Sequence, residues 1–394
     1  MIDHWFEPQA LEMLIYDLAN YFIFFLIFYY LLKKNYIGEK LFIISSILLL
    51  TPFLFNGIMF DWTYLPDQSK YLSLSYRIRQ DFSNPINFFL CDPTKIYGLE
   101  NCEQNDIKVG FSSFFYAFSP IVNFETYKSI GFYNRFLFII SVIFFYKKKA
   151  IDINLFYLLL LSPSLILFSS VGLRDNLILL VMLFWVYYMY ENKYFKVIFL
   201  SIIILAIKIQ NFLIFGISAF LIFVNSKKKL LKLLAISSSL LILLLIIFYF
   251  NEMLWWVNKL RRGLFLEEFG HYKSISSLLF YEKIRLGLDL NSLRIISINL
   301  VNFIFSPLKD LDSLFKLVIF TENIFLYTIL TYQFFKNYRL NKNETLIWFC
   351  VLVFSLLMYS VFVFNDAQIH RYKTPIIFFI IFAYNLNLKK KIIK

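Results

Sequence analysis

The chain has 394 residues, of which 60% are hydrophobic and 21% aromatic, and its formal net charge is +13. This composition excludes an ordinary water-soluble domain, because repeated apolar runs of about 15 to 22 residues are long enough to enter or cross the hydrocarbon core of a bilayer. The positive charge does not indicate nucleic-acid binding, because most lysines stand in small clusters at the ends of the apolar runs.

The apolar runs predict helices, because they are continuous and lack the two-residue alternation of a closed barrel. We therefore predict an all-α fold, a polytopic transmembrane helix bundle that forms a single integral-membrane domain over residues 1–394. In chain order the predicted segments, about eleven in all, are 14–32, 41–60, 130–146, 151–170, 173–190, 196–210, 211–225, 230–250, 316–335, 345–364 and 374–388. The first is not predicted to be a cleaved signal peptide, because the residues before it are acidic. The two short segments beside Lys208 predict a broken hairpin that turns inside the membrane.

The lysine-rich breaks assign the sides of the membrane. Under the positive-inside rule they are cytoplasmic, with the N-terminus outside and the C-terminus inside. The breaks are 33–40, 147–149, 193–196, 227–232, 336–342 and 389–394. Two long segments, 61–129 and 251–315, then lie on the outer side, and any chemistry is expected there.

The cysteine and histidine residues give little evidence for a metal. Cys91 and Cys102 both fall in the first outer segment, where a disulfide and two free thiols remain equally open, because spacing alone does not fix the geometry. Cys350 lies inside a predicted membrane segment. The three histidines are scattered and no CxxC or HExxH motif is present, so we predict neither a metal site nor a cofactor.

Several cationic side chains fall on the predicted outer side, where the positive-inside rule predicts few. They are Arg77, Arg79, Arg135, Arg174, Lys208, Arg261, Arg262, Lys273, Lys283, Arg285, Arg294, Arg371 and Lys373. An arginine within the membrane costs about 2.5 to 3.5 kcal/mol on the insertion scale, so it requires a partner.

Two interpretations of Arg174 remain open. In the first, its side chain pairs with an acidic residue, extends to the membrane interface or caps a turn. In the second, it joins other cations around an anion at the outer leaflet. Its neighbour Asp175 is no simple partner, because adjacent residues on a helix point about 100° apart.

The stretch from Ser162 to Val224, "SPSLILFSSVGLRDNLILLVMLFWVYYMYENKYFKVIFLSIIILAIKIQNFLIFGISAFLIFV", resembles the core of EpsG-like and Wzy-type polysaccharide polymerases. It contains an outward arginine, a "KYFK" turn and a short span with a polar break. "NGIMFDWTYLPDQSKYL" (56–72) is similar to the early outer segment of that family. The resemblance implies a polymerase that transfers a growing glycan from undecaprenyl pyrophosphate to an incoming undecaprenyl-pyrophosphate-linked repeat unit. It implies the periplasmic face of the bacterial inner membrane and leaves room for a chain-length regulator as a partner.

A second resemblance keeps an alternative open. "PDQSKYL" (66–72, within the chain's first outer segment) and "HRYKTPIIFFIIFAY" (370–384) are similar to GT-C glycosyltransferases, which use a polyprenyl-phosphate monosaccharide as donor. A GT-C-like arrangement of the bundle is the fold that this resemblance implies. A flippase or transporter of lipid-linked oligosaccharides is less favoured, because the spans show no two matching Gly/Pro-interrupted halves.

The expected site residues follow from these readings. Fixed cations suit a leaving pyrophosphate, and the candidates are Arg174, Lys208 and Arg371, followed by Arg135 and Arg294. The candidate bases for the sugar hydroxyl are Asp175, Asp61, Asp67 and His370. Trp255, Trp256 and Tyr272 either stack on sugars or anchor the chain at the membrane interface.

Overall fold

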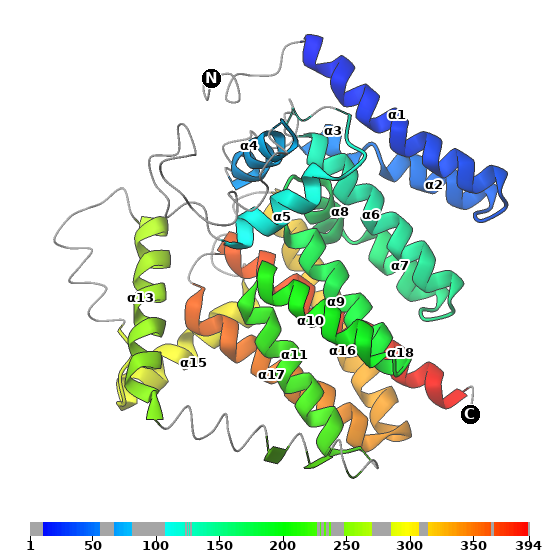
Figure 1. The fold of residues 1–394 in the computed structure, drawn as a ribbon. Helices are drawn as coiled ribbons and strands as arrows, with labels where there is room; N and C mark the ends of the chain where they lie inside the picture. The colour runs from blue at the N-terminus through cyan, green and yellow to red at the C-terminus, as the bar shows by residue number, and fades with distance from the viewer. Residues whose placement is uncertain are drawn as a thin grey trace. The chain divides into compact units, whose positions relative to one another are not determined.

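The computed structural model describes residues 11–55, 67–80, 107–122, 124, 126, 128–226, 248–269, 285–306, 314–363 and 366–392, together with the single residues 229, 232, 233, 236 and 237. Within these ranges the regular structure is helical and contains no strand (Figure 1). The chain divides into two compact units, Met1–Ile209 and Gln210–Lys394, which we describe separately. The prediction of a single domain stays a prediction.

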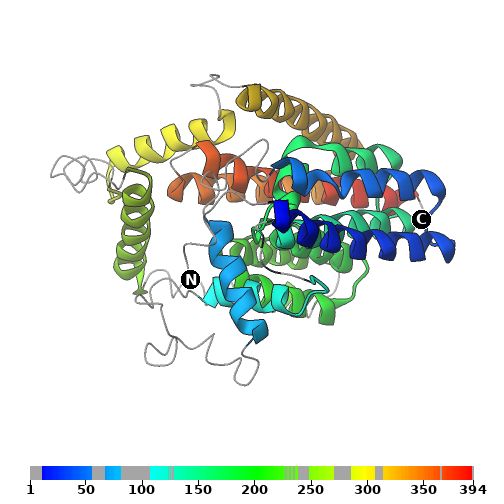
Figure 2. The ribbon, with the colours of Figure 1, turned by 90° about the horizontal axis from the view of Figure 1, so that it is seen from above.

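The first unit is built around one buried helix. Its helices are α1 (Leu11–Lys33), α2 (Glu39–Leu48), α3 (Thr51–Phe55), α4 (Asp67–Gln80), α5 (Ile107–Ala117), α6 (Lys128–Lys147), α7 (Ile153–Leu161), α8 (Pro163–Ser170), α9 (Asp175–Tyr190) and α10 (Tyr194–Ile207). The central helix α6 is buried along most of its length and packs against α1, α3, α7, α8 and α9. On the outside of the unit α1 and α2, the two darkest blue helices of Figure 2, run side by side.

Helices α1 and α6 run in the same direction. At their starts the Lys128 Nζ donates to the Asp17 Oδ2 at 3.1 Å. At their ends the Lys147 Nζ lies 5.4 Å from the ring centre of Tyr36, just beyond α1. The lysine-rich ends of the two helices therefore lie at the same end of the unit.

Helix α9 runs parallel to α6. The Asn176 Nδ2 in the first turn of α9 donates to the main-chain oxygen of Asn134 near the start of α6, at 2.8 Å. Near the other ends, the rings of Phe145 and Tyr187 lie 5.7 Å apart. The starts of α1, α6 and α9 thus define one end of the unit, opposite the lysines.

Two of the predicted membrane segments are broken in the structure. The segment 151–170 forms α7 and α8, which meet at an angle of 56°. Ser162 ends α7 and caps α8, and Pro163 occupies the first turn of α8, where a missing N–H costs nothing. The segment 41–60 begins as α2 and α3, with a turn between them, and its last residues lie outside the described part of the chain.

The second unit packs around its last helix. Its described helices are α11 (Ile209–Val224), α13 (Phe250–Phe269), α15 (Leu290–Phe305), α16 (Leu314–Leu340), α17 (Lys342–Phe362) and α18 (Asp366–Ile392). Residues 376–388 of α18 are buried, and α18 packs against α15, α16 and α17. Asn341 separates α16 from α17 and caps α17 by accepting from the Glu344 N.

The described helices are those of a multi-pass membrane protein. Four stretches are long and apolar enough to cross a bilayer: Leu14–Lys33, Lys128–Lys147, Lys316–Leu340 and Lys342–Phe362. The bent pair α7 and α8 makes a fifth if it is counted as one span. Shorter apolar helices are α9, α10, α11 and α15. The count of about eleven spans stays a prediction.

Reporter fusions test the predicted sides. Because the lysine-rich breaks follow the positive-inside rule, we expect fusions after Lys149, Lys229 and Lys342 to report the cytoplasm, and fusions near Glu103 and Glu282 to report the outer side. The activity of a paired cytoplasmic and exported reporter measures this. An exported signal at Lys149 would contradict the orientation and remove the reason for an outer site.

Candidate functional site

The segment from Ser170 to Arg174, here called the 170–174 loop, connects α8 to α9 and is held by side chains from four other helices. Gln68 of α4 accepts from the Gly172 N at 2.8 Å. Asn134 of α6 donates through its Nδ2 to the main-chain oxygens of Val171 and Leu173, both at 2.9 Å. Three of the loop's backbone polar groups are therefore bonded to protein side chains.

Tyr116 of α5 adds a further support from the same side. Its hydroxyl donates to the main-chain oxygen of Leu173 at 2.9 Å. Burial raises the pKa of Tyr116 well above its usual range, with a smaller contribution from the charge of Asp175. The hydroxyl therefore stays protonated at any physiological pH and keeps its donor role.

The start of the loop is wedged against α6. A Cβ added at Gly131 would lie 2.3 Å from the main-chain oxygen of Ser170, so only glycine fits at this point of α6. The Ser170 hydroxyl also shares a hydrogen bond of 2.5 Å with that of Thr51, at the start of α3. Both ends of the loop are thus fixed by the surrounding helices.

Arg174 leaves this fixed loop at the start of α9. Its side chain is half-buried, and its Nη1 is enclosed without a hydrogen-bond partner among the described residues. Asp175 follows in the first helical turn and is buried, close enough to Tyr116 for their charges to interact. The side chain of the neighbouring Asn176 also keeps a buried Oδ1 without a described partner. The arrangement presents a fixed cation together with carboxylate and amide oxygens.

Lys208 belongs to the same end of the first unit. Helices α9 and α10 are antiparallel neighbours, with the Trp185 Nε1 donating to the Ser201 Oγ at 3.0 Å. At 1.5 Å per residue, Lys208 at the end of α10 comes level with Ile178, so Arg174 lies only about 6 Å further along the axis of α9. Lys208 is buried and its extended backbone ends α10. The interruption of the helix that the sequence predicts at this residue is confirmed, whereas the hairpin inside the membrane stays a prediction.

Arg135 is placed differently from Arg174. It is 0% exposed. Its Nε donates to the Leu48 main-chain oxygen at 3.1 Å and its Nη1 to the Ser169 Oγ at 2.8 Å. Its Nη2 donates to the Leu160 main-chain oxygen at 3.3 Å. The guanidinium therefore joins the ends of α2 and α7 to α8, which is a structural role.

We expect Arg135→Ala to lower the stability of the first unit. The change leaves two carbonyls and a hydroxyl without their donor in a buried place, a loss of about 3 kcal/mol or more. Thermal unfolding in detergent and the amount of protein in the membrane measure it. A normally abundant Arg135→Ala protein without activity would instead support the sequence-based prediction that Arg135 binds substrate.

The candidate acids of the first outer segment are only partly described. Asp67 begins α4, is half-exposed and forms an ion pair with Lys70 at 3.3 Å. Asp61 lies outside the described residues. The neighbour of Asp67 is Gln68, which bonds the 170–174 loop. The start of α4 therefore lies at the loop, whereas the Asp67 carboxylate itself is engaged by Lys70.

The remaining candidates lie in the second unit. His370 is buried in α18 and Arg371 is half-buried, with its guanidinium 6.0 Å from the ring centre of Tyr372. The buried Lys373 Nζ donates to the main-chain oxygens of Ser306 (2.8 Å) and Ile304 (3.2 Å) at the end of α15. Arg294 is exposed near the other end of α15, about 15 Å away along that helix. Arg294 is thus kept apart from Lys373 and its contact with the end of α15.

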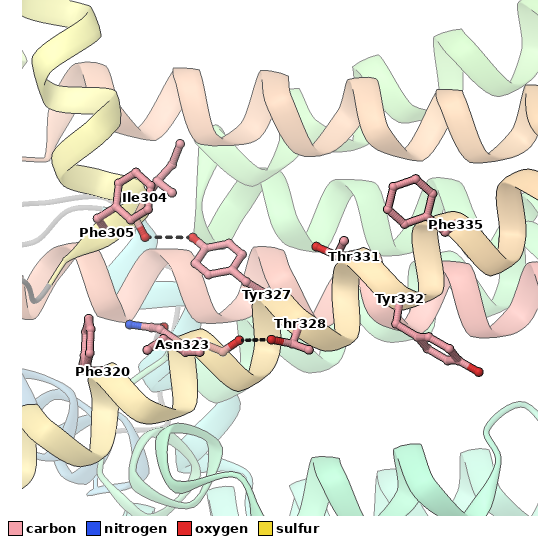
Figure 3. A pocket seen from close by; sticks show the side chains of 10 residues that line it. Ile304, Phe305, Phe320, Asn323, Tyr327, Thr328, Thr331, Tyr332 and Phe335 are labelled. Carbon is pink, nitrogen blue, oxygen red and sulfur yellow. Dashed lines mark hydrogen bonds between the residues drawn. The ribbon is translucent and has the colours of Figure 1, made fainter.

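An apolar groove of about 640 Å³ runs along α16 beside the end of α15 (Figure 3). Its lining residues are Ile304, Phe305, Phe320, Asn323, Ile324, Tyr327, Thr328, Thr331, Tyr332 and Phe335. The hydroxyl of Tyr327 donates to the Ile304 main-chain oxygen at 3.1 Å, as Figure 3 shows. The rings of Phe305, Tyr332 and Phe335 are largely exposed, so the groove opens on the outer surface of this unit.

Sequence reasoning missed the residues that hold the 170–174 loop, namely Gln68, Tyr116, Gly131 and Asn134. Two features of the sequence could have pointed to them. Asn134 is a polar residue in an apolar helix, and Gln68 lies in the stretch 56–72. The described part of the chain contains no group of three or more His, Cys, Asp or Glu side chains placed to hold a metal ion.

Comparison of the chain with protein-family models, curated proteins and solved structures gave no match. Its own fold and residues therefore define its class, that of a multi-pass helical membrane protein with a buried polar loop at one end of its first unit.

Proposed function

We propose that the protein is a repeat-unit polymerase of the O-antigen type in the bacterial inner membrane, with about eleven spans, a GT-C-like bundle and a periplasmic site. The observation that carries the proposal is Arg174, a cation at the mouth of a helix bundle on a loop that four surrounding helices fix. Its enclosed Nη1 has no hydrogen-bond partner among the described residues. A donor held this firmly and left unbonded suits an anionic ligand.

In the proposed reaction, a sugar hydroxyl of the incoming lipid-linked repeat unit attacks the anomeric carbon of the growing chain. A new glycosidic C–O bond forms while the C–O bond to undecaprenyl pyrophosphate breaks, and the bonding electrons leave with the pyrophosphate. Arg174 donates to that leaving group, and Lys208 adds positive charge from the neighbouring helix α10, at an offset of about one helical turn along the axis. The hydroxyl proton passes to a base of the protein.

Asp175 is our first candidate for the base. It adjoins Arg174, is buried, and lies on the same fixed turn. As the first residue of α9 its carboxylate also lies at the positive end of the helix dipole. His370, Asp61 and Asp67 remain alternatives, and Arg371 and Arg294 remain candidate contacts for lipid phosphates.

The groove along α16 suits a hydrocarbon chain. It is apolar, it opens on the surface of a candidate membrane span, and it extends from Phe320 to Phe335, about 22 Å along the helix. The second unit therefore offers a surface for the hydrocarbon chain of a lipid.

A gene deletion tests the function and separates it from the alternatives. In a deletion strain we expect undecaprenyl-pyrophosphate-linked single repeat units to accumulate on the outer leaflet, and lipopolysaccharide to carry one unit in place of a ladder. A complete ladder in which every band lacks one sugar would identify a single-sugar GT-C transferase. Accumulation on the cytoplasmic leaflet would identify a flippase. Mass spectrometry of the extracted lipids and gel analysis of lipopolysaccharide measure these outcomes.

A further inference from the structure

Helix α13 is fixed to the second unit by one face. The buried Asn258 exchanges two hydrogen bonds with the backbone of Leu286, at 2.8 and 2.9 Å. The buried Arg261 donates to the main-chain oxygen of Val361, in the last turn of α17. Because α17 is a candidate membrane span that ends at Phe362, this contact places Arg261 beside the end of that span.

The opposite face of α13 carries two tryptophans and a lysine. At 100° per residue, Trp255, Trp256 and Lys259 point away from Arg261. Trp255 is 55% exposed and Trp256 54%, and their ring centres lie 5.0 Å apart. The Lys259 Nζ lies 5.0 Å from one ring centre and 4.9 Å from the other. We call these three residues the α13 outer face.

The surroundings of this face are also apolar. Phe248, Tyr249 and Met253 are exposed beside it, and Glu252 is the acidic residue on the same side. On α17, against which α13 packs, Phe354 and Leu357 are exposed towards the end of the span. The described neighbours of the α13 outer face on its own helix are therefore mainly apolar, and α17 exposes apolar side chains as well.

We propose that α13 lies in the headgroup region of the bilayer, with Trp255 and Trp256 at the level of the lipid glycerol groups and Lys259 bound to lipid phosphate. Indole rings favour this region because one edge is apolar while the N–H forms hydrogen bonds. An ammonium above the rings matches the negative charge of phosphatidylglycerol or cardiolipin. The inference is independent of the proposed reaction, because it concerns which surface the membrane covers.

Depth-dependent fluorescence quenching of the full-length protein in lipid nanodiscs tests this. The probes are phosphatidylcholines with bromine at shallow or deep acyl positions. We expect the difference in emission between the native protein and the Trp255→Phe/Trp256→Phe variant to be quenched more strongly by the shallow bromines. Trp348→Phe is the control, because Trp348 is buried inside the unit and its emission should differ little between the two lipids.

The role of Lys259 is tested by changing the charge of the brominated lipid. When brominated phosphatidylglycerol replaces brominated phosphatidylcholine, quenching of the two indoles should rise, because Lys259 enriches the anionic lipid beside them by about fivefold or less. Lys259→Ala should remove this rise. Equal quenching at all depths, or none, would overturn the proposal. A decrease in quenching when soluble repeat-unit oligosaccharide is added would also overturn it, because the α13 outer face would then bind glycan.

Discussion

Replacing Arg174 with alanine is expected to leave the protein abundant in the membrane while lipopolysaccharide carries a single repeat unit in place of a ladder. Under the proposed mechanism, the enclosed guanidinium offers its donors to the leaving pyrophosphate. Removing one fixed donor of this kind lowers turnover about 100-fold or more. The loop should persist, because its backbone is bonded by Gln68, Tyr116 and Asn134 and not by Arg174. Gel analysis of lipopolysaccharide and quantification of the membrane protein measure the two effects.

Two further variants sharpen this experiment. Arg174→Lys should restore the ladder only in part, because lysine supplies a point charge where arginine supplies a planar fork of donors. Arg77→Ala is the matched control, since it removes the same charge from α4 of the same unit and should leave the ladder intact. A full ladder from Arg174→Ala at normal abundance would exclude the proposed role. Low abundance with a full ladder in the surviving protein would make Arg174 a structural residue.

The membrane class and most helix positions could be predicted from the sequence, because apolar runs and lysine clusters are local signals. The break at Lys208 was predictable in the same way, since two segments too short to span meet there. The angle between α7 and α8 was not predicted, although Ser162 and Pro163 form a local start signal for a new helix. The segments predicted to lie on the outer side contain α4, α5, α13 and α15, whose presence the apolar pattern left open.

The difference between Arg135 and Arg174 was beyond the sequence. Both are arginines in or beside an apolar helix, and the same insertion cost applies to both. Only the fold decides that Arg135 finds Leu48, Leu160 and Ser169, whereas the half-buried Arg174 keeps an enclosed Nη1 without a hydrogen-bond partner among the described residues. The supports of the loop are equally non-local, since the residues that bond it come from α4, α5 and α6. A pattern of neighbouring residues carries no information on such contacts.

The last prediction concerns the wedge beneath the loop. Gly131→Ala should shorten or abolish the ladder, because the new Cβ would lie 2.3 Å from the Ser170 main-chain oxygen. That atom belongs to the backbone and cannot rotate away, so α8 and α6 must separate by about 1 Å, with a loss of about 1 to 3 kcal/mol. The separation would also stretch the bonds from Asn134 to Val171 and Leu173. A displacement of about 1 Å at a positioned group lowers turnover about 100-fold.

Gly216→Ala is the control for this change. Gly216 lies in α11, also within a helix, and a Cβ there would meet nothing within 4 Å. Both substitutions gain the same helix propensity, about 1 kcal/mol, so any difference between them comes from the contact with Ser170. We expect Gly216→Ala to keep a full ladder and unchanged or slightly higher thermal stability. If Gly131→Ala behaves like Gly216→Ala in both measurements, the 170–174 loop is not held against α6, and the fixed position of Arg174 on which the proposed function depends is lost with it.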